Sequence, residues 1–242
     1  MKKTKTTLTF AGQAGFILES SSGLCIGVDL YLSNCCERYF GFKRLMPYLY
    51  DPLELELDAV VATHAHYDHF DPDSVPLLLR NGKTRLVAAR DVKIEAEKLG
   101  LNPDQITYLG IGDSYSDDAV TIKALPCDHG ELAPDALGLL ITMDGKRIYI
   151  TGDTAYREDY FTNPELAGVD VLILPINGAF GNLDALAGAR AAGLIRAGLT
   201  IPCHYWNFAE HGGDPAAFAE AMKTDHADLA YLLMRPGESI EL

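Results

Sequence analysis

The segment His64-Ala65-His66-Tyr67-Asp68-His69 constrains the fold of this chain more than any other feature, because it directly follows an apolar run at residues 58–63. In an extended chain His64 and His66 point to the same side. Asp68 and His69 follow at a turn, where we expect a helix to begin. Imidazole and carboxylate donors so close together suit Zn²⁺, Mn²⁺ or Fe rather than Ca²⁺. The sequence therefore predicts a buried strand that ends at a metal.

Three further side chains that can bind metal also come just after apolar runs. They are His129, Asp153 and His204. The ends of strands hold donors rigidly around one point, so the chain supplies enough ligands for two ions. Asp128 is the alternative to His129 as a ligand. Gly152 allows the chain the sharp approach that a bridging carboxylate at Asp153 needs.

Strand-like runs come early in the chain, and helical signals lie between the later ones. The apolar, β-rich runs cover residues 7–10, 15–19, 24–29, 59–63, 85–88, 119–125, 138–143, 147–151, 169–174, 200–203 and 239–242. Helical signals cover residues 91–100, 183–198 and 214–222. This order favours an α/β (α+β) fold of two β-sheets with outer helices over a doubly wound parallel sheet. With 242 residues and no long linker, we expect a single domain over residues 1–242.

The metal-binding pattern, taken in order along the chain, resembles the signature of the metallo-β-lactamase superfamily. More narrowly, the chain resembles the L-ascorbate-6-phosphate lactonase-like branch. The matching segments are GVDLYLS, KRLMPYL, LDAVVATHAHYDHFDP, IYITGDTAYRED and IPCHYWNF. The resemblance implies the metallo-β-lactamase fold, an αββα sandwich of two mixed β-sheets flanked by helices.

The resemblance also implies which residues hold the metals. One ion would be bound by His64, His66 and His129, and the other by Asp68, His69 and His204. Asp153 would bridge the two ions. Asp29, at the end of the run 24–29, matches a family aspartate beside the metals, and we expect it to support a ligand rather than to bind an ion.

The function that the resemblance implies is that of a metal-dependent hydrolase. We expect a lactonase that opens a small, phosphorylated sugar-acid lactone, with a metal-bridging hydroxide attacking the carbonyl. Asp68 and Asp153 are the expected catalytic carboxylates, since either can orient the water. Two divalent ions, two carboxylates and a hydroxide leave a local charge of about +1, which suits an anionic substrate or transition state. Nitrogen and oxygen ligands admit Mn²⁺, Zn²⁺ or Fe, and the lactonase resemblance favours Mn²⁺.

Two other functions stay open. A phosphodiesterase acting on RNA ends or cyclic nucleotides would use the same pair of ions. The net charge of −14 argues against RNA but not against small cyclic substrates. The second alternative is a non-catalytic metal-binding regulator, against which the complete ligand set speaks.

Residues for substrate binding are predicted from their distance to the ligands. Arg157 follows Asp153 closely and could hold a phosphate, although a surface pair with Glu158 or Asp159 explains it equally well. Asn177 would face the site or serve only its turn. Tyr205 follows His204, and His211 lies in the next loop. Residues 31–53 form a long loop with Lys43, Arg44 and several aromatic side chains, which we expect to act as a lid.

The net charge and the cysteines limit the partners and the compartment. An acidic protein lacks the basic face that nucleic acid or an anionic membrane requires, so we expect a small anionic substrate instead. Five cysteines without a CxxC spacing fit neither a disulfide framework nor a zinc ribbon. With no signal peptide or membrane span in the sequence, we expect a soluble, reduced, cytoplasmic protein. A homo-oligomer is compatible with this expectation.

Overall fold

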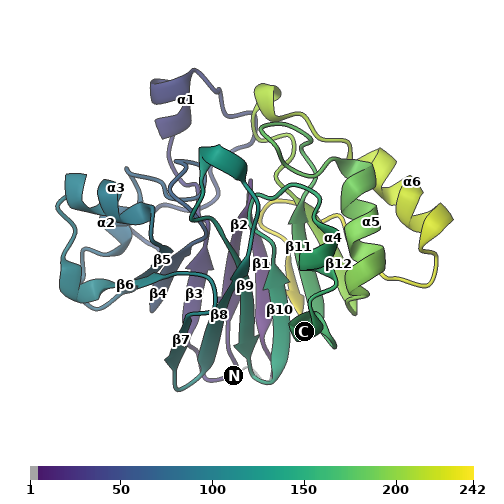
Figure 1. Cartoon of the computed structure of the whole chain (residues 1–242). Helices are drawn as coiled ribbons and strands as arrows, with labels where there is room; N and C mark the ends of the chain where they lie inside the picture. The colour runs from purple at the N-terminus through teal and green to yellow at the C-terminus, as the bar shows by residue number, and fades with distance from the viewer. Residues whose placement is uncertain (1–4) are drawn as a thin grey trace.

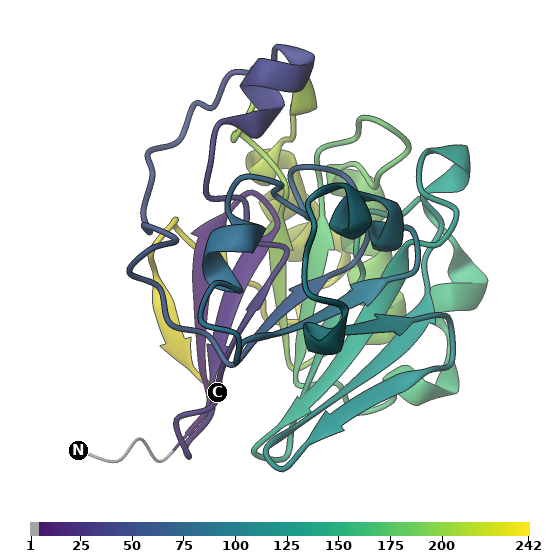
Figure 2. The same cartoon turned by 90° about the vertical axis from the view of Figure 1, so that its left-hand side faces the viewer.

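Two mixed β-sheets lie face to face, with helices on both outer sides (Figures 1 and 2). The computed structural model describes residues 5–242. The first sheet has the order β13-β1-β2-β3-β4-β5-β6. Its strands are β1 (Thr7–Gly12), β2 (Gly15–Glu19), β3 (Cys25–Val28), β4 (Ala59–Ala62), β5 (Arg85–Ala89), β6 (Ile106–Leu109) and β13 (Ser239–Glu241). Pairing is antiparallel from β13 to β3 and parallel from β3 to β6.

The second sheet has the order β12-β11-β10-β9-β8-β7. Its strands are β7 (Ser114–Asp117), β8 (Val120–Pro126), β9 (Leu137–Met143), β10 (Lys146–Ile150), β11 (Val171–Pro175) and β12 (Leu199–Cys203). Pairing is antiparallel from β7 to β10 and parallel from β10 to β12. Strands β8, β10 and β12 therefore run in one direction and end at the same edge.

Helices cover the outer faces of the two sheets. The α-helices are α1 (Cys35–Phe40), α2 (Val75–Leu78), α3 (Val92–Lys98), α4 (Glu158–Phe161), α5 (Ala185–Ile195) and α6 (Pro215–Asp225). Four short 3₁₀ turns are η1 (Pro103–Gln105), η2 (Gly130–Leu132), η3 (Pro164–Leu166) and η4 (Ala209–His211). The side chains of Asp184 and Asp214 cap α5 and α6 by accepting hydrogen bonds from Ala187 N and Ala217 N.

The main core lies between the two sheets. Phe16 and Val61 of the first sheet pack in the same cluster as Ile122, Ile141 and Ile173 of the second, and all are buried. Their neighbours along each strand point outward, because side chains alternate across a strand. On the outer face of β11, Leu172 and Leu174 pack against α5 and α6. On the outer face of β4 and β5, Val60 and Leu86 pack against α2 and α3. This arrangement is the αββα sandwich that the sequence predicts.

Three local expectations were wrong. No helix begins at Asp68, because residues 67–70 form turns and α2 starts only at Val75. The loop at residues 31–53 contains α1, which ends at Gly41 with a φ of 77°. Strands β6 and β7 were not anticipated, since β7 is largely exposed and polar. Within residues 5–242 no helix has the length and apolar character needed to cross a membrane.

Candidate metal centre

The side chains predicted to bind metal meet at one edge of the sandwich. His64, His129, Asp153 and His204 each lie within three residues of the end of a strand, on β4, β8, β10 and β12 respectively. Together with His66, Asp68 and His69, these residues form three overlapping clusters, and within each cluster the ligand atoms lie within 4.8 Å of one another. The clusters are His64/His66/His129, His64/His69/Asp153 and Asp68/His69/His204.

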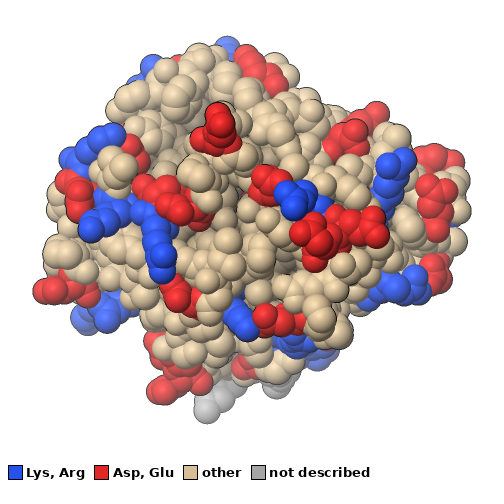
Figure 3. Space-filling model, viewed as in Figure 1, with Lys and Arg blue, Asp and Glu red and all other residues tan. Residues whose placement is uncertain are grey.

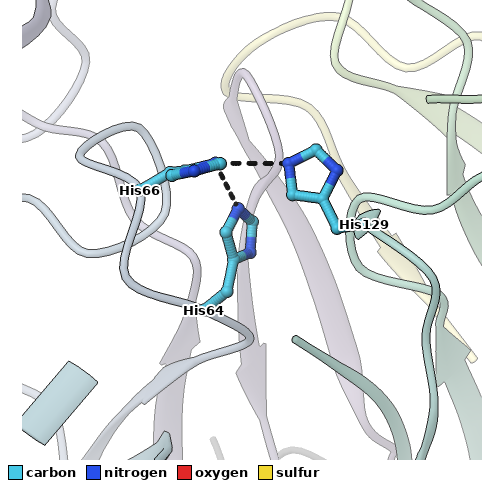
Figure 4. Close-up of side chains that lie close together, drawn as sticks. All are labelled: His64, His66 and His129. Carbon is cyan, nitrogen blue, oxygen red and sulfur yellow. Dashed lines mark hydrogen bonds between the residues drawn. The ribbon is translucent and has the colours of Figure 1, made fainter. Parts of the chain in front are cut away.

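The three imidazoles of the first cluster point toward one another (Figure 4). His66 Nδ1 lies 3.0 Å from His64 Nε2 and 3.2 Å from His129 Nε2. Neighbouring groups fix the tautomers. His66 Nε2 lies 3.2 Å from the carbonyl oxygen of Leu132, which can only accept a hydrogen bond, so Nε2 carries the proton. Thr63 Oγ1 donates to Asp29 Oδ2, so it can only accept from His64 Nδ1, 3.0 Å away.

In these neutral tautomers, His64 Nε2 and His66 Nδ1 turn lone pairs toward each other. Two lone pairs at 3.0 Å repel unless a cation lies between them. The first cluster therefore fits a metal ion by the chemistry of its donors.

The second cluster contains a nitrogen with no partner. His69 Nδ1 donates to Asp29 Oδ2 at 2.9 Å, which leaves Nε2 as the ring nitrogen that faces the site. This buried atom has no hydrogen-bond partner. It lies 3.4 Å from Asp153 Oδ1 and 3.7 Å from Asp68 Oδ2. A carboxylate that accepts a hydrogen bond from the other ring nitrogen, as Asp29 does here, is a usual partner of a metal-bound histidine.

Asp153 contacts residues of the first cluster (His64/His66/His129) and of the third (Asp68/His69/His204). Its Oδ2 lies 3.1 Å from His204 Nε2 and 3.9 Å from His129 Nε2. The preceding Gly152 has a φ of 66°, and a Cβ there would lie 2.6 Å from the carbonyl oxygen of Leu137. Only glycine therefore lets the chain bring this carboxylate between the two clusters.

The ionised forms of Asp68 and Asp153 are stabilised although both side chains are buried. Burial opposes ionisation, but His69 and His204 hold the pKa of Asp68 and of Asp153 well below the usual range. Burial also opposes charge on His204, but Asp153 and Asp68 outweigh it and raise its pKa to about 9. The same balance raises the pKa of His69 well above its ordinary value. The site is thus built to hold positive charge.

Asp29 lies where the sequence places it, behind a ligand. It is buried, and its Oδ1 accepts from Thr63 N at 2.8 Å. Its Oδ2 accepts from Thr63 Oγ1 and from His69 Nδ1. Asp29 therefore orients His69 and, through Thr63, also His64.

Two residues that support the carboxylates were missed by the sequence analysis. Gln13, in the β1–β2 turn, donates from Nε2 to Asp68 Oδ2 at 2.8 Å. Asn182 donates from Nδ2 to Asp153 Oδ2 at 2.7 Å. The sequence shows only a polar residue between two nearby glycines, Gly12 and Gly15; the burial of Gln13 and its φ of 54° are known from the structure alone.

Three predicted substrate residues do not line the cavity beside the metal ligands. Arg157 pairs with Asp128 at 2.9 Å and with Asp159 at 3.3 Å. Asn177 bonds within its own turn, to the carbonyl of Ala179.

Tyr205 is buried in the core around α5 and α6. His204 has a φ of 60°, and the side chain of Tyr205 that follows it packs with residues of α5 and α6 and does not line the cavity. His211, by contrast, does line the cavity. Its ring stacks on that of His204, with centroids 4.9 Å apart.

The comparisons with known proteins agree with this geometry. A model of the beta-lactamase superfamily domain matches residues 31–205. A UPF0173 metal-dependent hydrolase of Methanosphaerula palustris is 31% identical, over 97% of this chain and 99% of that protein. One from Thermus thermophilus is 32% identical over 78% and 83% of the two chains. The solved structure of Igni18, a metallo hydrolase from Ignicoccus hospitalis, has a TM-score of 0.76 and 25% identity, and 99% of each chain is covered. The chain therefore belongs to the beta-lactamase superfamily and to the UPF0173 metal-dependent hydrolases.

Proposed function

We propose that this metal-dependent hydrolase uses two ions to open small lactones. The observation that carries the proposal is the convergence of seven donor side chains into overlapping clusters that share His64 and His69. His64, His66 and His129 would hold one ion, and Asp68, His69 and His204 the other. Asp153, which contacts both sets, would bridge them.

The ions, when bound, would supply an acidified water and Lewis acidity at a carbonyl oxygen. The protein's own residues fix the surroundings. Asp68 lines the cavity, and the amide of Gln13 holds its Oδ2, so this carboxylate is positioned to orient a water. Gln13 Nε2 also donates to His211 Nδ1 at 3.1 Å. Neutral His211 then carries its proton on Nε2 and can donate it to a developing oxyanion.

The lactone class rests on the resemblance to the L-ascorbate-6-phosphate lactonase-like branch. A binuclear centre with a local charge of about +1 favours a reaction that builds negative charge on oxygen. Mn²⁺ or Zn²⁺ suits this set of nitrogen and oxygen donors. The protein as a whole is acidic and only the site is cationic, so the site suits a small substrate that fits inside it.

The test is turnover of a lactone panel by protein loaded with Mn²⁺ or Zn²⁺, with a chromogenic phosphodiester beside it. We expect lactone hydrolysis that His204→Ala lowers by at least about 100-fold. His226→Ala, a histidine outside the site, serves as the matched control. Turnover of the diester alone would replace the proposal with a phosphodiesterase, and an inert metal-loaded protein would favour a regulator.

A further inference from the structure

The cavity over the metal ligands has a floor and walls of different chemistry. It measures about 480 Å³, within the range typical of small-molecule sites. Its polar lining consists of five of the proposed ligands (His66, Asp68, His129, Asp153 and His204) and His211. The remaining walls are largely apolar, from Phe40, Phe42, Tyr67, Leu132 and Phe180, with smaller contributions from Cys36 and Ala65.

The aromatic wall is continuous although its members come from distant segments. Phe40 ends α1, Phe42 follows the turn at Gly41, and Phe180 lies between β11 and α5. The ring centroids of Phe40 and Phe42 are 6.1 Å apart, and those of Phe42 and Phe180 are 5.9 Å apart. Phe42 also meets the edge of His211 at 5.4 Å, so the wall reaches the polar floor.

Much of this apolar wall remains accessible. Phe40 is 55% exposed, Phe180 46% and Leu132 57%. Exposed apolar groups that gather around one opening mark a binding surface more often than single exposed residues do. A ligand carrying an apolar group would remove these side chains from water while its polar group lies on the floor.

Two nearby arginines are engaged elsewhere, and no lysine or arginine among residues 5–242 lines the cavity. Arg44 donates to the carbonyls of Tyr31 and Ser33 and stacks on the Tyr31 ring, with its guanidinium carbon 4.1 Å from the centroid. Arg157 is held by Asp128 and Asp159. Lys43 is exposed.

The surface offers no alternative basic patch on the face seen in Figure 3, where acidic and basic groups lie side by side. A phosphate on the substrate would therefore meet aromatic rings instead of a guanidinium fork.

We propose that the substrate is a neutral carbonyl compound with an apolar chain or ring, which packs against the Phe40–Phe42–Phe180 wall. The proposal rests on the hydrolytic function above and specifies its substrate class. It replaces the phosphorylated sugar acid expected from the sequence with an apolar lactone or ester.

The experiment compares a series of γ-lactones whose alkyl chain grows from none to six carbons, together with a phosphorylated sugar lactone. We expect kcat/KM to rise about fourfold per added methylene until the cavity is filled. The phosphorylated lactone should be the poorest substrate. Binding of the matching 5-alkyl pyrrolidinones, which are slow to hydrolyse, is measured in parallel by calorimetry on the metal-loaded protein.

Variants locate the effect on the wall. Phe180→Ala and Leu132→Ala should each lower kcat/KM for the hexyl lactone by about tenfold, a larger loss than either variant causes for the unsubstituted lactone. Ile94→Ala is the matched control, because Ile94 is 62% exposed and does not line the cavity. Arg157→Ala should change neither substrate series.

The outcomes separate this proposal from the function on which it rests. If no lactone is opened but pyrrolidinone affinity rises with chain length, the lactonase function fails and the apolar site stands. If lactones are opened with no dependence on chain length, the apolar site is wrong. A preference for the phosphorylated lactone that Arg157→Ala abolishes would also overturn it.

Discussion

Gln13 Nε2 donates a 2.8 Å hydrogen bond to Asp68 Oδ2, which joins the β1–β2 turn of the first sheet to the histidine-rich segment after β4. The opposite amide orientation would place an oxygen against the carboxylate, so the amide nitrogen must face Asp68. The bond holds the Asp68 carboxylate toward His204, whose Nε2 lies 3.2 Å from the same oxygen.

Gln13→Ala should therefore weaken metal binding at the Asp68/His69/His204 cluster by about 10- to 100-fold, because Asp68 loses its fixed orientation. Metal titration against a competing chelator measures this. Gln105→Ala is the control, since Gln105 is also a buried glutamine whose amide donates two hydrogen bonds, to Leu79 O and Thr84 O, far from the site. Equal losses of metal affinity in both variants would mean that Gln13 acts only through folding.

Asp29→Asn tests the orientation of His69. The amide would present a donor to His69 Nδ1, and the ring would then shift its proton to Nε2, the atom that faces the site. We expect a 10- to 100-fold loss of affinity for the ion at Asp68/His69/His204 and a smaller loss for the ion at His64/His66/His129, because Asp29 reaches His64 only through Thr63. Asp58→Asn, which alters a carboxylate bonded to Cys25 N at 2.7 Å, should leave both affinities unchanged. Unchanged metal affinity in Asp29→Asn would show that Asp29 does not orient His69 for metal binding.

Gly152→Ala and Gly145→Ala separate backbone strain from a steric clash. Both glycines have positive φ, 66° and 78°, but a Cβ at Gly145 meets nothing within 4 Å. Gly145→Ala should cost about 1 kcal/mol in the free energy of unfolding, from backbone strain alone. Gly152→Ala should cost about 3 kcal/mol or more, since its Cβ would strike the Leu137 carbonyl. Denaturant unfolding measures both, and equal losses would contradict the clash.

The parts of the fold and of the metal site that can be predicted from the sequence are those that neighbouring residues determine. The ligands in His64–His69 are predictable because neighbouring residues fix their geometry. The two-sheet fold follows from the order of the apolar runs. Gln13 is different, because its role depends on the turn of one hairpin meeting a segment 55 residues away.

The errors have the same origin. In the loop after β11 the sequence predicts Asn177 at the site, whereas the side chain that contacts Asp153 is that of Asn182. Tyr205 was expected at the site, but its side chain packs in the core around α5 and α6. Both placements depend on tertiary contacts that no local pattern reports.

Metal binding should release protons, with a sign that follows from the pKa shifts. His204 has a pKa of about 9 in the metal-free protein, above its ordinary 6.5, and that of His69 is also raised. Both must lose a proton to bind an ion, whereas Asp68 and Asp153 are already ionised. Calorimetry in buffers of different ionisation enthalpy should show about two protons released at pH 7.

The same shifts predict how stability and affinity vary with pH. Metal affinity should rise between pH 6.5 and 9. The stability that protonated His204 gives the metal-free protein is fully present below 6.5, and it is lost as the pH rises through about 9. A metal affinity that stays constant over this range would contradict the assignment of His204 and His69 as ligands.

The most direct measurement is an anomalous difference map from crystals of the protein loaded with Zn²⁺ or Mn²⁺, recorded at the absorption edge of the metal. The account predicts two peaks, one among His64, His66 and His129 and one among Asp68, His69 and His204, with Asp153 between them. A single peak in a protein that still hydrolyses its substrate, or peaks away from these residues, would contradict the binuclear centre.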